Sequence, residues 1–188
     1  NDDVYALQFL SQILSGPRTA RLTKALVYDL QSAAMVAAFN SAAENAGTFS
    51  LRITPRPGHS LAEVEATADS IIARLKQEGP TAEELAKTSA GIEFRFVSQL
   101  QSNLGKANIL NGGLVFHGDA ARFKRDFAKL KAVTTADVKR VANKYLGAGR
   151  VVLSIVPLGK ADQASAVSKS TRVTVAPDGG HYIMGDKR

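Results

Sequence analysis

The sequence contains no cysteine, which excludes disulfides, thiolate metal ligands and a cysteine nucleophile. This absence is compatible with both a reducing and an oxidising compartment. Histidine is scarce, with three residues in 188, and neither His-x-x-Glu-His nor His-Glu-x-x-His occurs. Gly-x-Ser-x-Gly and Gly-x-x-x-x-Gly-Lys-Ser/Thr are missing as well. The sequence therefore predicts no helix-borne zinc site, no nucleophile elbow and no phosphate-binding loop of these types.

The three histidines do not combine with other residues into a metal site. His59 stands four residues before Glu63, which provides two ligands where a zinc site needs three or more. His117 and His181 lie in glycine-flanked loops with no histidine nearby. The acidic pair Glu83-Glu84 falls at a predicted helix start, where carboxylates favour the helix dipole. We therefore expect no metal ligand and no catalytic residue in this chain.

Long apolar runs are also absent. No stretch approaches the ~18 to 20 apolar residues that span a bilayer, and no basic stretch followed by an apolar run opens the sequence. The chain begins with Asn1-Asp2-Asp3 rather than methionine, and we interpret it as a processed or excised piece of a longer protein. Its 45% apolar and 22% charged content is typical of a globular domain.

A formal charge of +7 raises the possibility of nucleic-acid binding. The lysines and arginines are nevertheless scattered along the whole chain. Their densest stretch, residues 122–131, alternates with Phe123, Phe127 and Leu130 at helical spacing, which indicates the solvated face of an amphipathic helix. The alternative, a patch for an anionic polymer, predicts an affinity for DNA that falls steeply with salt.

Helical periodicity dominates the first 150 residues. The first predicted helix covers 4–14, with Asp2 or Asp3 as its cap, and a second covers 18–29 after Gly16-Pro17. Ser60 with Glu63 and Thr81 with Glu84 have the spacing of capping boxes, so each predicts a helix start. The remaining expected features are bends near Gly91 and Gly105, a turn at 111–113, a helix over 121–131 and a last helix capped by Thr135 and ending at Gly147.

Three segments have the character of strands. Residues 48–54 alternate strictly between polar and apolar, which places Phe49, Leu51 and Ile53 on one buried face. Together with the short apolar run 35–39 they predict a β-hairpin. Residues 151–156 are rich in β-branched side chains and predict a central strand.

These elements indicate an α+β fold in which helices cover one face of a small, mostly antiparallel sheet. We expect a single domain over 1–158 that lacks its first strand, because three strands are few for so many helices. Residues 159–188 change to alanine, serine, lysine and glycine without periodicity, apart from a possible strand at 172–175. That composition predicts a tail or an inter-domain linker.

The succession of segments over about residues 3–157 resembles one half of a pitrilysin/insulinase-family zinc peptidase, similar to the halves of mitochondrial processing peptidase. The segments that carry the resemblance are Leu10-Ser11-Gln12-Ile13-Leu14-Ser15-Gly16, Thr19 to Val27, Gly47-Thr48-Phe49, Gly79 to Leu85, Val133 to Val138 and Ala142 to Leu146. The resemblance implies two similar halves that enclose a chamber for extended peptides. One half carries zinc on His-x-x-Glu-His and a downstream glutamate, and this chain is similar to the other, carboxy-terminal and inactive half.

The resemblance also points to a departure from the family pattern. In many relatives an arginine and a tyrosine seven residues apart follow the Arg-Leu motif and bind the substrate near the cleaved bond. Placing Arg21-Leu22 on that motif puts Val27 and Ala34 at these two positions, and neither side chain donates a hydrogen bond. Tyr28 is the alternative, but one residue turns a helical side chain by about 100°. The substrate-binding residues of this chain therefore remain unassigned from the sequence.

From this resemblance we expect the non-catalytic half of a bacterial zinc metallopeptidase, forming one wall of the cleavage chamber and supporting substrate binding. Its expected partners are a zinc-binding half, in the same chain or another subunit, and extended peptides, with neither nucleic acid nor a membrane span. Zinc is expected in that partner, no cofactor in this domain, and the resemblance favours the periplasm. The alternative is an assembly scaffold without proteolysis, which a missing His-x-x-Glu-His in the upstream and neighbouring reading frames would favour.

Overall fold

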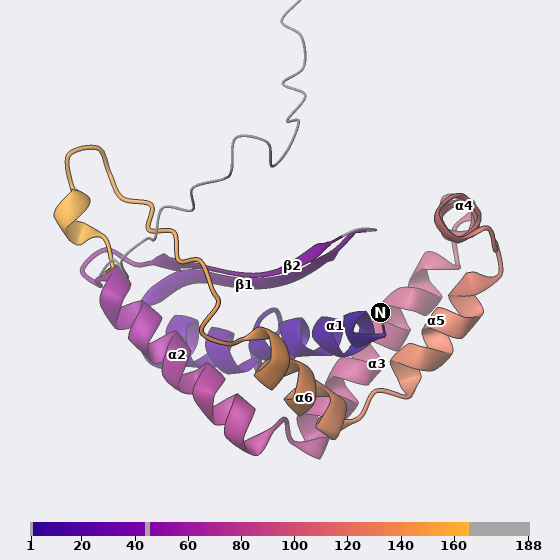
Figure 1. The fold of residues 1–188 in the computed structure, drawn as a ribbon, viewed down its shortest axis with the longest axis horizontal. Helices are drawn as coiled ribbons and strands as arrows, with labels where there is room; N and C mark the ends of the chain where they lie inside the picture. The colour runs from indigo at the N-terminus through magenta and orange to yellow at the C-terminus, as the bar shows by residue number, and fades with distance from the viewer. Residues whose placement is uncertain (1, 44–45, 166–188) are drawn as a thin grey trace, which may run out of the picture.

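Helix α1 (Asp3–Leu14) runs through the middle of the molecule, and the other elements pack around it (Figure 1). The computed structural model describes residues 2–43 and 46–165. A hairpin of β1 (Ala33–Ala42) and β2 (Gly47–Pro55) lies along one side of α1, and helices occupy the other sides. The helices are η1 (Thr23–Asp29), α2 (Leu61–Glu78), α3 (Ala82–Gln99), α4 (Asn103–His117), α5 (Arg122–Lys131), α6 (Thr135–Tyr145) and the short η2 (Ala161–Gln163). The predicted α+β fold, with helices on one face of a small antiparallel sheet, is confirmed.

The core is built on the apolar stripe that the sequence shows in α1. Phe9, Leu10, Ile13 and Leu14 are buried there because they recur every three or four residues and so share faces of the helix. Their larger buried neighbours come from η1 and the residue before it, β1, α2, α3 and α6, and they are Leu22, Leu26, Val36, Val64, Leu75, Ile92, Val138 and Val141. These elements are thus held by one continuous core, to which α4 and α5 contribute no buried residue.

The hairpin turns one face towards this core. Its strands pair antiparallel, with Val36 opposite Ile53 and Ala38 opposite Leu51. Phe49, Leu51 and Ile53 are half-buried against the core, as the alternation of residues 48–54 predicts. The buried hydroxyl of Ser15, at the end of α1, accepts a hydrogen bond from the Ala38 backbone N–H at 2.6 Å and fixes β1 against that helix.

The capping signals place several helix starts correctly. Thr81 forms the predicted reciprocal box with Glu84 at the start of α3, and Ser60 accepts from the Glu63 N–H at the start of α2. The cap of α6 is Thr134, in a box with Asp137, rather than Thr135. The predicted side-chain cap of α1 is wrong: Asp3 lies in the first turn and its carboxylate binds Arg140, Lys144 and Tyr145 of α6 instead.

Three local expectations about helices need correction. The segment 18–29 is helical only from about residue 21 and is wound as a π-helix over Thr23–Asp29. α3 continues through Gly91 without a break and ends at Gln99. The expected turn at 111–113 lies inside α4, where Gly113 has no side chain because a Cβ there would come within 2.6 Å of the Asp119 carbonyl oxygen. Gly113 therefore permits a close approach of the segment that follows α4 rather than a turn.

The predicted central strand at 151–156 does not form in the described part of the chain. The segment is extended without a strand partner, and Val151, Leu153 and Ile155 are largely exposed. β-Branched composition shows only that a segment suits a sheet, and a strand forms where a neighbouring backbone supplies hydrogen bonds. The possible strand at 172–175, and most of the predicted tail, lie outside the described residues.

Candidate functional site

The two positions that the resemblance indicates differ in their burial. Val27 belongs to η1 and is half-buried against the core, whereas Ala34 is exposed on β1. Tyr28, one residue after Val27, is exposed, and the guanidinium of Arg18 lies 4.5 Å from the centre of its ring. The structure therefore gives Val27 a packing role, Ala34 an open position on the hairpin and Tyr28 a cation-π contact.

The Arg-Leu motif holds the fold together. Leu22 is fully buried, and Arg21 reaches across to the junction of α2 and α3. Its guanidinium donates to both carboxylate oxygens of Glu84, at 2.7 and 2.8 Å, and to the Gly79 carbonyl oxygen at 3.0 Å. Burial by itself would raise the pKa of Glu84, but the hydrogen bonds from Arg21 and from the Thr81 backbone outweigh it and lower that pKa.

A residue in a left-handed conformation joins η1 to the hairpin. Gln31 has φ of 51°, a region in which an L-residue costs roughly 1 to 2 kcal/mol. Gln31→Gly is expected to raise the free energy of unfolding by about 0.5 kcal/mol, because relief of this strain exceeds the greater flexibility of glycine in the unfolded chain. Urea unfolding measures the change. Gln31→Ala keeps the strain and serves as the control, and a destabilised glycine variant would contradict this reading.

Among the residues that the structure describes, no helix covers the outer face of the hairpin (Figure 1). In the observed register Met35 lies opposite Thr54, Ala37 opposite Arg52, and Phe39 opposite Ser50, all on the side away from the core. Met35 and Phe39 are about half exposed, at 45% and 51%. The sequence did not point to these residues, because alternation identifies a buried face and leaves the function of the opposite face open.

The outer edge of β2 is open. Because the Ala38 N–H donates to Ser15, it points away from β2, so Ala38 and Leu51 form a non-hydrogen-bonded pair whose backbone groups face outwards. By alternation the N–H and C=O groups of Phe49 and Ile53 also face the outer edge of β2. In the described residues no backbone or side-chain group is hydrogen-bonded to this edge. An extended peptide can pair with such an edge through its main chain.

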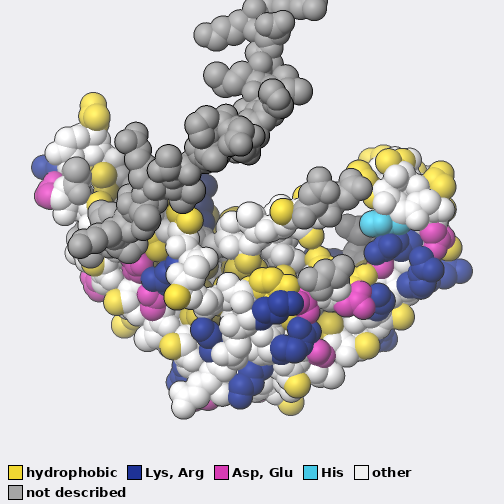
Figure 2. All heavy atoms as spheres, in the orientation of Figure 1, with side chains coloured by type: hydrophobic (Ala, Val, Ile, Leu, Met, Phe, Trp, Pro, Cys, Tyr) yellow, Lys and Arg dark blue, Asp and Glu magenta, His cyan; other side chains and the backbone are white. Residues whose placement is uncertain are grey.

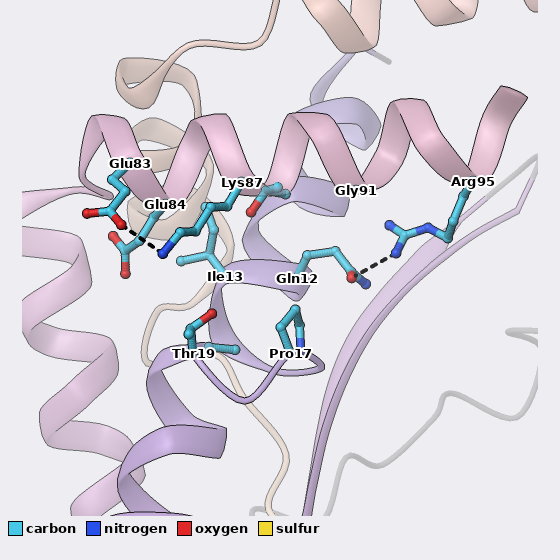
Figure 3. A pocket seen from close by; sticks show the side chains of 11 residues that line it. Gln12, Ile13, Pro17, Thr19, Glu83, Glu84, Lys87, Gly91 and Arg95 are labelled. Carbon is cyan, nitrogen blue, oxygen red and sulfur yellow. Dashed lines mark hydrogen bonds and ion pairs between the residues drawn. The ribbon is translucent and has the colours of Figure 1, made fainter.

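A separate cavity of about 380 Å³ lies between α1, the loop after it and α3 (Figure 3). Figure 3 shows Gln12, Pro17 and Thr19 facing Lys87 and Arg95 across it. Lys87 is paired with Glu83 at 2.7 Å, and Arg95 donates weakly to Gln12 at 3.4 Å. Among the described residues, no histidine, cysteine or serine lines this cavity.

Most basic residues of α5 have ion-pair partners, as expected for a solvated helix face. Lys129 pairs with Asp2 and Lys131 with Glu93. On the other side of α5, Phe123, Phe127 and Leu130 are half-buried, and the ring of Phe127 stacks on Phe96 at 4.3 Å. The interpretation of residues 122–131 as an amphipathic helix is confirmed.

Within residues 2–43 and 46–165 no three His, Asp or Glu side chains gather closely enough to hold a metal ion. His59 pairs instead with Glu63, with its Nδ1 3.2 Å from a carboxylate oxygen. His117 ends α4 as its last residue, and His181 lies outside the described residues. Among the described helices, none combines the length and apolar character needed to cross a bilayer.

Comparison with known families gives a match over the first part of the chain. Residues 1–92 match the family model described as the peptidase M16 inactive domain. No curated, characterised protein matches the sequence.

Several solved structures share the fold. A protease from Helicobacter pylori has a TM-score of 0.72 at 22% identity, covering 78% of this chain and 35% of that chain. The inactive peptidase domain of a proposed zinc protease from Bordetella parapertussis has a TM-score of 0.70 at 20% identity, covering 84% and 86%. A peptidase M16 inactive domain from Pseudomonas fluorescens has a TM-score of 0.65 at 20% identity, covering 78% and 35%. The chain thus spans about a third of the length of the first and third of these relatives.

Proposed function

We propose that the chain is the non-catalytic half of a zinc metallopeptidase. The premise is that residues 1–92 match the M16 inactive domain, which is the non-zinc-binding half of pitrilysin/insulinase-type peptidases. In this proposal it pairs with a zinc-binding half, in the same polypeptide or another subunit. It forms one wall of a chamber in which extended peptides are cleaved. Residues 1–158 constitute the domain, and 159–188 form a tail or linker.

The match to inactive peptidase domains, in sequence and in fold, carries this proposal. The hairpin adds physical support. Its outer face offers the half-exposed Met35 and Phe39 beside Arg52, and the free edge of β2 offers main-chain donors and acceptors. Main-chain pairing is independent of side-chain identity, so such an edge binds extended peptides of varied sequence. An apolar outer face adds affinity by covering the peptide's side chains.

In the proposed division of labour the chemistry belongs to the partner. Zinc there polarises the scissile carbonyl and activates water. The residues of this chain hold the peptide extended: the outward backbone groups of Phe49, Leu51 and Ile53 pair with it, and Phe39 covers part of its surface. Val27 and Ala34 contribute no hydrogen bond to the substrate from their side chains. In this proposal substrate binding by this half rests on the hairpin rather than on an arginine and tyrosine pair.

The test uses the purified chain, the separately purified zinc-binding half identified by its His-x-x-Glu-His, and an unstructured fluorogenic peptide. The chain alone is expected to retain no zinc and to hydrolyse nothing, and mixing the two halves is expected to produce hydrolysis that a chelator abolishes. Phe39→Ser is expected to raise KM about fivefold with little change in kcat, because it removes roughly 1 kcal/mol of uniform binding.

Val152→Ser removes an apolar side chain of similar exposure away from the hairpin and is the matched control. Stoichiometric zinc or chelator-sensitive hydrolysis in the chain alone would contradict the proposed division of labour. If Phe39→Ser and Val152→Ser changed KM equally, the hairpin would not be a substrate-binding surface. Absence of His-x-x-Glu-His from the same and the neighbouring reading frames would favour the assembly scaffold.

A further inference from the structure

Helix α4 presents its large apolar side chains to solvent. None of its residues is buried, and Leu104, Leu114 and Val115 are 72%, 57% and 64% exposed. At about 100° per residue these three and Leu110 fall within an arc of roughly 140° on one side of the helix. We call this set, Leu104, Leu110, Leu114 and Val115, the α4 arc. Soluble monomeric proteins rarely leave several large apolar side chains on one helix face uncovered.

Small residues set this orientation. The side of α4 that faces the rest of the molecule contains Gly105, Ile109, Gly112 and Gly113, which are half-buried, and at the end of the helix the 76% exposed Phe116. A Cβ at Gly105 would come within 1.9 Å of the Gln99 carbonyl oxygen, and one at Gly113 within 2.6 Å of the Asp119 carbonyl oxygen. Only glycine allows these close approaches, so rotating α4 to bury the arc would bring side chains into backbone. The outward direction of the arc is therefore built into the sequence.

Positive charge lies beside the arc. Residues 103–131, which include α4 and α5, contain six lysines and arginines against two aspartates. Lys106 on α4 and Lys124 on α5 have no acidic group within 4.0 Å among the residues the structure describes. Figure 2 shows hydrophobic side chains gathered at the α4 end of the molecule, directly beside a group of Lys and Arg side chains. The surface is thus an apolar helix face with a basic rim.

We infer that the α4 arc docks into an apolar groove, rimmed by aspartate and glutamate, on the zinc-binding half. This inference rests on the proposed function. An apolar helix face that enters a groove is a common mode of recognition, and Leu110 and Leu114 have the i, i+4 spacing of its anchors. Acidic residues at the groove's edge would complement Lys106 and Lys124 and accelerate association.

Two observations favour this occupant over others. A second copy of the chain would bring two basic rims together, which repel each other. Asn111 lies within the arc and is exposed. If the arc entered a lipid surface, the amide of Asn111 would be buried without hydrogen-bond partners. A protein groove can supply them.

The test measures binding of the full 188-residue chain to the purified zinc-binding half by calorimetry, at low and moderate salt. Leu114→Asp is expected to weaken binding at least 30-fold, since it places a charge in the desolvated centre of the interface. Phe116→Asp makes the same charge change on an exposed residue of α4 outside the arc and is expected to change the affinity less than threefold. Leu110→Ser tests the α4 arc without adding a charge and is expected to weaken binding as well. Circular dichroism verifies that each variant folds.

The outcomes separate this inference from the proposed function. If the wild-type chain does not bind the zinc-binding half, the proposed function fails and the inference fails with it. If the wild-type chain binds and Leu114→Asp binds equally well, the arc is not the interface, while the proposed function stands. Two other outcomes would overturn the inference. In the first, the chain self-associates, and in the second it binds phosphatidylglycerol vesicles; in either, Leu114→Asp abolishes that binding and leaves the affinity for the zinc-binding half unchanged.

Discussion

Replacing Asp3 by asparagine is expected to lower the free energy of unfolding by about 2 to 3 kcal/mol at pH 7. The side chain of Asp3 is 9% exposed at the start of α1. It accepts hydrogen bonds from Arg140 and Lys144, each at 2.7 Å, and from the Tyr145 hydroxyl at 2.8 Å. Three donors from α6 therefore meet on one buried anion. Arg140 and Lys144 are themselves about half exposed, so solvent weakens their attraction and the effect stays below that of a fully buried ion pair.

The same cluster predicts a dependence on pH. Hydrogen bonds from Lys144, Arg140 and Tyr145 lower the pKa of Asp3 far below its ordinary value of 3.8. A carboxylate whose pKa is lowered by folding stabilises the folded state fully above the unfolded pKa, and loses that contribution as the pH falls towards the folded pKa. The difference in stability between wild type and Asp3→Asn should therefore be constant above about pH 5 and shrink progressively below pH 4.

Urea unfolding of both proteins at several pH values between 3 and 7 would measure this difference. Asp2→Asn is the matched control, because Asp2 pairs with Lys129 at the surface and its loss should change stability little. A pH-independent difference, or equal effects of the two substitutions, would show that Asp3 does not join α1 to α6 electrostatically.

Replacing Arg21 by methionine is expected to destabilise the fold by about 2 to 3 kcal/mol. Methionine retains the aliphatic part of the side chain but leaves the Glu84 carboxylate and the Gly79 carbonyl without their donor. Both members of the pair are largely shielded, with side-chain exposures of 16% for Arg21 and 26% for Glu84. An unpaired, partly buried carboxylate at the start of α3 is the main source of the loss.

A double-mutant cycle with Glu84→Gln isolates the pair from the other contacts of each residue. The two substitutions together should cost clearly less than the sum of their separate effects. Lys87→Met removes the exposed pair with Glu83 on the same helix and is expected to change stability little. Additive effects of Arg21→Met and Glu84→Gln would mean that the Arg-Leu motif does not stabilise the fold through this ion pair.

Local signals predicted the features that depend on neighbouring residues. The Thr81 and Glu84 box fixed the start of α3, because its two hydrogen bonds are complete within four residues. The alternation of residues 48–54 fixed the buried face of β2, because strand side chains alternate by geometry. Each of these required no knowledge of distant parts of the chain.

Where local signals failed, a distant partner decided the outcome. Asp3 has the composition of a helix cap, but α6, more than 130 residues away, provides three stronger donors. Gly112 and Gly113 have the composition of a turn, yet they lie in α4 because the backbone that follows α4 packs against Gly113. Residues 151–156 suit a strand, but no backbone in the described residues pairs with them. Glycine, aspartate and β-branched residues are each compatible with several local structures. Which of these forms depends on the groups that the rest of the fold places beside them.

The sequence by itself predicted an α+β domain that resembles the inactive half of a zinc peptidase, and it placed Val27 and Ala34 at the two positions where that resemblance leads us to expect a polar pair. Residue identity and spacing are enough for such conclusions, because ligand sets and helical or strand periods are local. Only the tertiary structure showed that Arg21 is a structural residue, that the outer edge of β2 has no partner among the described residues, and that α4 turns its leucines outwards. Those properties depend on which surfaces the packed elements cover, and side-chain composition does not specify that.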